Sequence, residues 1–210
     1  MTFNSHDHRS ALVTHNTGLW EGFFLRLDAT GVEQERLSTL LEVKETHGII
    51  QTCLTYQNSG QQQSVNFKSL PTSMQVSDQG HWSTGPEFIT PWNWVSELCV
   101  VNPQQRRRMI VCHGATGLDR IIYVVEARTG SQLPHPDSPL NCQSRPFGSL
   151  IIWQPELGVE LIIDPRNREQ GDATGCGIRW IDKNGNKLQI LRQYNSAGLL
   201  TPRSDVWHTN

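Results

Sequence analysis

The 210-residue sequence has little excess charge of either sign. Its 18 Lys and Arg residues stand against 20 Asp and Glu residues, which leaves a net charge of −2 near pH 7. A chain without a strong positive field has no general attraction for nucleic acid or for an anionic membrane surface. We therefore expect no nucleic-acid partner.

Long hydrophobic runs and closely spaced cysteines are also missing. No stretch approaches the roughly 18 apolar residues of a transmembrane helix, and residues 1–9 lack the apolar region of a secretory signal. The cysteines are odd in number and include no Cys-x-x-Cys pair, which argues against a disulfide framework and a structural zinc site. They are Cys53, Cys99, Cys112, Cys142 and Cys176. We expect a soluble, cytoplasmic protein with no membrane span, no metal and no cofactor.

Short alternating segments separated by turn residues are abundant. After a short helix expected at 9–16, turns such as Asp28-Ala29-Thr30-Gly31 and Asn58-Ser59-Gly60 punctuate residues 17–128. The strands expected here are 18–28, 33–44, 49–57, 62–70, 73–77, 81–84, 93–101, 106–113 and 118–128. Nine short strands joined by tight turns predict an all-β, antiparallel up-and-down barrel, because closure removes exposed edges.

The second part of the chain differs in composition. Residues 131–148 are rich in proline and predict an extended connection between a barrel at 9–130 and a C-terminal segment at 149–208. Five further short strands are expected in that segment, at 149–154, 158–163, 176–182, 187–194 and 199–207. They are too few for a second barrel of ordinary size, so we expect them to complete or cover the first one.

Two stretches carry a family resemblance. Gly18-Leu19-Trp20-Glu21-Gly22-Phe23-Phe24-Leu25-Arg26-Leu27, with the turn at Gly31, resembles the opening of an uncharacterised calycin (lipocalin-like) family of cyanobacteria and plastid-bearing organisms, known as a domain of unknown function. The segment from Leu188 to Gly198 resembles its end. The resemblance covers 17–128 and, more weakly, 176–207. It implies a β-barrel with Trp20 at its floor and a hydrophobic small-molecule pocket, and it transfers no catalytic residue.

A tight turn predicts the register of one hairpin. If Asn102 faces Gln105, Trp94 faces His113 and Leu98 faces Met109 on one sheet face, while Glu97 lies diagonal to Arg108 on the other. Trp94, Met109 and His113 would then line a pocket wall on the same interior face as Trp20. His113 is the best candidate for a hydrogen-bond donor or general base. The alternative is an ordinary core histidine.

Arginines and aromatic residues complete the candidate site. Arg120 is expected either to stack on Trp20 or to lie at a solvated strand end. The run Arg106-Arg107-Arg108 predicts a solvated hairpin, because successive strand residues point to opposite faces. Trp82, Phe88, Trp92 and Trp94 surround the loop 85–91, which could be a ligand gate or a latch against the C-terminal strands. The predicted ligand-binding residues are Trp20, Phe24, Trp94, Met109, His113 and Arg120.

Three functions remain open from the sequence. The first is binding of an apolar small molecule of the pigment, polyene or terpenoid type. The second is a calycin-type enzyme, either a cyclase or isomerase or a bilin-chromophore lyase, since shape-driven catalysis needs few titratable groups. The third is an assembly factor whose barrel is filled by its own side chains. An interior void of several hundred cubic ångströms would favour the first two. A homodimer is also left open.

Overall fold

A computed structural model describes residues 5–136 and 138–206. Within these residues the chain forms one helix, α1 (Ser5–Asn16), and fourteen strands, whose pairings are all antiparallel. The strands are β1 (Gly18–Asp28), β2 (Glu33–Thr46), β3 (Ile49–Tyr56), β4 (Gln62–Phe67), β5 (Gln75–Val76), β6 (Trp82–Thr84), β7 (Trp94–Val101), β8 (Gln105–Gly114), β9 (Gly117–Arg128), β10 (Gln143–Phe147), β11 (Leu150–Gln154), β12 (Val159–Ile163), β13 (Thr174–Ile181) and β14 (Lys187–Tyr194). The fold is therefore all-β apart from α1.

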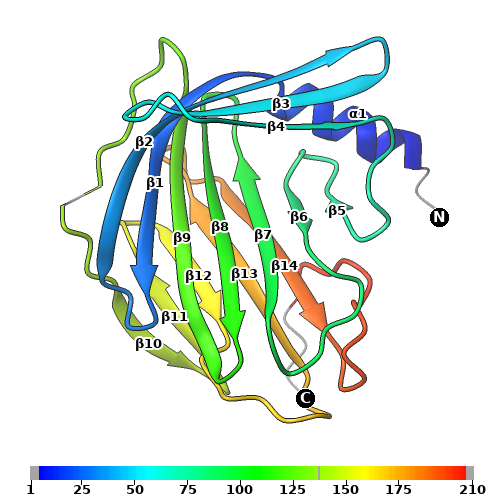
Figure 1. Cartoon of the computed structure of the whole chain (residues 1–210), viewed down its shortest axis with the longest axis vertical. Helices are drawn as coiled ribbons and strands as arrows, with labels where there is room; N and C mark the ends of the chain where they lie inside the picture. The colour runs from blue at the N-terminus through cyan, green and yellow to red at the C-terminus, as the bar shows by residue number, and fades with distance from the viewer. Residues whose placement is uncertain (1–4, 137, 207–210) are drawn as a thin grey trace.

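The first nine strands form one curled sheet, in the order β4-β3-β2-β1-β9-β8-β7-β6-β5. The meander is as predicted, and β1 pairs with β9. The sheet does not close, however, because β4 and β5 are consecutive in the chain yet lie at opposite edges. Figure 1 shows the resulting half barrel, with β3 and β4 arching over one end beside α1. The prediction of a closed barrel is wrong. Pro71 interrupts the segment between β4 and β5, and β5 is only two residues long, so little backbone is left to join the two edges.

The last five strands form a separate sheet, in the order β10-β11-β12-β13-β14. It packs on the first sheet, where β13 and β14 contact β7 and β13 also contacts β8. β10 begins at Gln143, inside the expected connection 131–148. Residues 199–206 form no strand, although Leu199 and Leu200 make isolated bridges to Phe88 and Tyr194. The second sheet thus covers the outer face of the half barrel.

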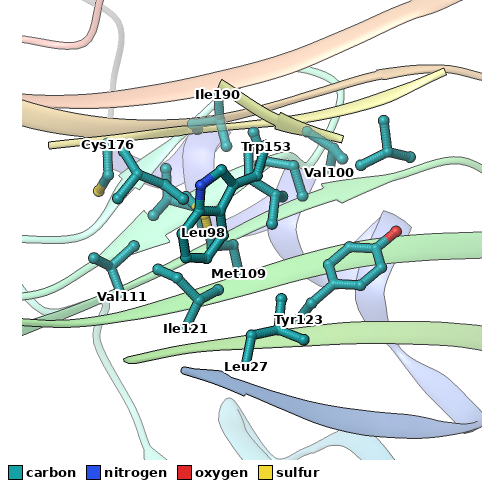
Figure 2. Close-up of a cluster of buried hydrophobic side chains, with 14 of the residues drawn as sticks. Leu27, Leu98, Val100, Met109, Val111, Ile121, Tyr123, Trp153, Cys176 and Ile190 are labelled. Carbon is teal, nitrogen blue, oxygen red and sulfur yellow. The ribbon is translucent and has the colours of Figure 1, made fainter. Parts of the chain in front are cut away.

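The main hydrophobic core lies between the two sheets and is called the inter-sheet core below. The first sheet contributes Leu98, Met109 and Tyr123, and the second contributes Trp153 and Ile190, which all meet in one layer (Figure 2). Each of these five side chains is at most 1 % exposed. Burial of this apolar layer holds the two sheets together.

A second cluster lies on the concave face of the curled sheet. Leu12 of α1 joins apolar residues of β1, β2, β3, β5 and β7 there, and α1 itself contacts β2 and β5. The buried members of this concave-face cluster are Leu12, Trp20, Leu41, Val43, Ile50, Val76, Cys99 and Val101. One face of the first sheet therefore packs against the second sheet, and the concave face packs against α1.

All five cysteines are free thiols. Burial raises the pKa of Cys99, Cys142 and Cys176 to about 12, so these thiols stay protonated at neutral pH. Across residues 5–136 and 138–206, the structure contains no helix with the length and hydropathy needed to span a bilayer.

Candidate functional site

A cavity of about 390 Å³ occupies the concave face of the curled sheet. Most of its wall is apolar and comes from α1, from β2 to β4 and from β6. The apolar wall includes Leu12, Leu41, Val43, Ile50, Leu54 and Trp82. β7 and β8 supply a charged floor of Glu97, Arg106 and Arg108. The cavity thus combines an apolar chamber with a small polar region.

The burial of the lining shows where the cavity meets solvent. Gln63 and Val65 of β4, and Pro71 in the segment that follows, are exposed. Val43 and Arg106 are buried. The mouth therefore lies at the free edge of β4, where the barrel is open, and the arginines lie at the deep end.

The floor is a buried network of two arginines and two carboxylates. Glu126 is 0 % exposed and accepts hydrogen bonds from Arg108 Nη2 at 2.9 Å and Arg106 Nε at 2.5 Å. Arg108 Nη1 donates to Glu97 at 2.5 Å. Burial alone would raise the pKa of Glu126, but the charges and hydrogen bonds of Arg106 and Arg108 hold it below its usual range. Glu126 is therefore ionised and forms ion pairs with both arginines.

Arg106 is less well satisfied than Arg108. Among the described residues, Nε is the only side-chain nitrogen of Arg106 that makes a hydrogen bond, and the buried Nη2 has no partner. Arg108, by contrast, uses all three of its nitrogens. An unpaired donor in a buried site is costly, because it has lost water and gained nothing.

Trp20 lies beneath this network and is fully buried. Its indole Nε1 donates to Asn16 O at 2.9 Å, and the guanidinium carbons of Arg106 and Arg128 lie 4.3 and 4.4 Å from its ring centroid. Gly22 makes room for Glu126 and the backbone of β9, because a Cβ there would lie 2.2 Å from Val125 O and 2.6 Å from Glu126 Cγ. Gly18 does the same for Arg128, whose Nη1 would lie 2.3 Å from an added Cβ. The two glycines around Trp20 thus admit Glu126 and Arg128.

Arg120 is not the arginine that stacks on Trp20. It pairs with Asp28 in the register of β1 and β9, at the end of β1 opposite to Trp20, and forms an exposed ion pair with Asp119. Arg106 and Arg128 take the predicted place. Phe24 projects from the same face as Trp20, and the guanidinium carbon of Arg108 lies 5.1 Å from its ring centroid.

The predicted register of β7 and β8 is confirmed, but its predicted face is wrong. Trp94 pairs with His113, Leu98 pairs with Met109, and Glu97 bonds Arg108. However, Trp94 and Met109 belong to the inter-sheet core, on the face opposite to Trp20. The reason lies in the register of β9. Trp20 pairs with Arg128 of β9, so Glu126, two residues away, is on the same face. Glu126 in turn pairs with Arg106 of β8, which places Arg106 and Arg108 on the concave face with Trp20.

His113 stacks on Trp94 with a centroid distance of 4.2 Å and is 4 % exposed. Burial, followed by the charge of Arg168, lowers the pKa of His113 from 6.5 to about 4. The imidazole is therefore neutral at pH 7. Neither of its ring nitrogens has a hydrogen-bond partner in the described part of the chain. It lies away from the cavity.

The arginine run is not a solvated hairpin. Arg106, Arg107 and Arg108 are all less than 8 % exposed. Their predicted alternation between the two faces is correct, because Arg107 faces the second sheet. There it bonds Glu156 and lies 4.6 Å from the ring centroid of Trp180.

The aromatic loop 85–91 is attached to the C-terminal segment. Phe88 bridges Leu199, and Ile89 N donates to Gly198 O at 2.9 Å. Arg168 Nη2 donates to Pro91 O at 3.3 Å. These bonds favour the latch over the ligand gate. Of the four aromatic residues around this loop, Trp82 lines the cavity.

Most residues that line the cavity are not among those predicted from the sequence. The alternation of β2 and β3 could have identified Leu41, Val43 and Leu54. The diagonal pair Glu97–Arg108 is predicted correctly, but on the face away from the expected pocket, whereas it lines the cavity. None of the six predicted ligand-binding residues belongs to the lining, although Trp20 and Phe24 contact its arginines. Within the residues that the structure describes, no group of three or more His, Cys, Asp or Glu side chains could hold a metal ion.

Comparisons with known proteins identify the family. The family model described as "Domain of unknown function (DUF3598), N-terminal" matches residues 5–131. A solved structure of a protein with unknown function from the DUF3598 family of the cyanobacterium Nostoc punctiforme is similar over 95 % of this chain and 96 % of its own, with 14 % identity and a TM-score of 0.73. That similarity shows a shared fold. No curated protein matches the sequence. Because the family match spans more than half of its length, the chain belongs to the DUF3598 family.

Proposed function

We propose that the protein binds an apolar small molecule, of the pigment, polyene or terpenoid type, in the cavity on the concave face. The observation that carries this proposal is the cavity itself, with a volume of about 390 Å³ and a mostly apolar wall. Ligand sites are commonly concave and apolar, with a few placed polar groups. A half barrel filled by its own side chains would leave no such space.

The curled sheet is, in this proposal, an opened variant of a lipocalin-like (calycin) barrel. It keeps an N-terminal helix over one end, pairing of its first and last strands, and a buried tryptophan near the start of β1. The separation of β4 from β5 provides the way in for the ligand.

Catalysis has less support. Within the described residues, the cavity lining contains no His, Cys, Ser, Asp, Lys or Tyr, and its one carboxylate, Glu97, accepts a hydrogen bond from Arg108. A general acid or base is therefore harder to assign than a binding role. The cyclase, isomerase and lyase alternatives would have to rely on shape alone.

The test is a titration with the methyl ester of cis-parinaric acid, an uncharged fluorescent polyene. The parent protein should bind it with an increase in emission. Leu54→Trp adds a ring inside the cavity and should weaken binding by roughly ten-fold or more, since overpacking costs about 1–3 kcal/mol. Leu157→Trp is the matched control, because Leu157 is 94 % exposed and outside the cavity. Equal binding by all three proteins, or none by the parent, would contradict the proposal.

A further inference from the structure

We propose that the ligand of this cavity carries a single terminal carboxylate, which binds the guanidinium of Arg106. This inference rests on the proposed function and adds the chemical class of the ligand. Arg106 lines the deep end of the cavity and is 1 % exposed. Its Nη2 is buried without a partner among the described residues.

The charges around the cavity floor leave one cation in excess. Arg106 and Arg108 share Glu126, and Arg108 also takes Glu97. Arg128, on the same Trp20 ring, donates among the described residues only to backbone carbonyls: Pro103 O, Thr17 O and His15 O. Three guanidiniums thus face two carboxylates. One further negative charge would balance the group. Arg128 is half-buried, but Arg106 and Glu126 are buried, which makes the balance energetically important at the cavity floor.

The geometry favours a carboxylate as the source of that charge. In the part of the chain that the structure describes, Nε is the only side-chain nitrogen of Arg106 with a hydrogen-bond partner. The two terminal nitrogens of its planar fork are therefore available, and a carboxylate can accept from both. The rest of the wall is apolar and leads to the mouth at β4. An amphiphile would therefore bind with its carboxylate deep in the cavity and its hydrocarbon part towards Val65.

The test compares two probes of equal length, dodecanoic acid and dodecanol, at about pH 8, where the acid is ionised. Each displaces the methyl ester of cis-parinaric acid from the full chain. The parent should prefer the acid by about 10- to 100-fold, the range for hydrogen bonds to a charged group. Arg106→Met should bind the two probes about equally, with its affinity for dodecanol retained. That retention shows an intact cavity.

Arg107→Met is the matched control, because Arg107 is an equally buried neighbour that faces the second sheet. It should keep the preference for the acid. If Arg106→Met does not fold, Arg106→Lys supplies the test, since it keeps the charge but loses the fork and should retain a reduced preference.

Three outcomes would overturn the inference. If the parent binds the acid and the alcohol with equal affinity, the inference of a carboxylate is wrong, but the proposed function is unaffected. If Arg106→Met still prefers the acid to the alcohol, a residue other than Arg106 binds the carboxylate. Tighter binding of dodecyl phosphate than of dodecanoate would show that the site prefers a phosphate head group to a carboxylate. Failure of the parent to bind either probe or the ester would instead contradict the proposed function itself.

Discussion

At the level of single residues, Trp20 joins the cavity floor to the N-terminal helix. Its ring contacts Arg106 and Arg128, and its indole nitrogen bonds Asn16 at the end of α1. A cation over an indole face gains electrostatic attraction, which grows when water is excluded. Trp20 thus supports the arginine that we assign to the ligand without itself lining the cavity.

Trp20→Ala should lower the free energy of unfolding by about 3–5 kcal/mol, as other large-to-small core changes do. The ring is fully buried, and its loss would leave a void beneath two guanidiniums. Urea denaturation measures the change. Trp92→Ala is the control, because Trp92 is 58 % exposed and its loss should cost no more than about 0.5 kcal/mol. A similar small cost for both variants would show that Trp20 is not part of the structural floor.

At the level of elements, β8 separates the two faces of the molecule. Arg106 and Arg108 face the cavity, while Arg107 and Met109 face the second sheet. Tyr123 of β9 adds to the second face, where its hydroxyl donates to Glu156 at 2.5 Å. β8 therefore carries both Arg106, the candidate ligand contact, and the residues that pack against the second sheet.

A chain that ends at residue 131 should aggregate rather than fold as a stable monomer. It would expose Leu98, Met109 and Val111, which are 0 % exposed when the second sheet covers them. The cost is large, because each fully buried aliphatic side chain contributes about 1.5–3 kcal/mol. Size-exclusion chromatography and dye binding, with the full chain as control, measure the effect. A monomeric fragment that unfolds cooperatively would instead indicate two independent domains.

At the level of the whole molecule, the local features were predictable from the sequence and the long-range ones were not. The turn after Asn102 is local, and it predicted the register of β7 and β8 correctly. The choice of face depends on the pairing of Trp20 with Arg128, more than a hundred residues away. The alternation of the arginine run is local and is predicted correctly, but its burial is not. That burial depends on Glu126 and Glu156, which come from elsewhere in the chain and make it tolerable.

Openness of the barrel was equally hard to predict. The sequence indicated consecutive strands, and closure is the usual way to protect their edges. In the structure β5 and β6 are too short to extend the sheet to β4, and the gap becomes the mouth of the cavity. The candidate ligand site therefore depends on a feature that strand counting misses.

Methyl-resolved NMR tests most directly whether the ligand binds on the concave face. The protein, labelled at Leu and Val methyl groups, is titrated with the methyl ester of cis-parinaric acid. The cavity residues Val43 and Leu54 should shift strongly, while Val111 and Leu161 of the inter-sheet core should not. Strong shifts at Val111 and Leu161 with none at Val43 and Leu54 would place the ligand between the sheets and contradict the account.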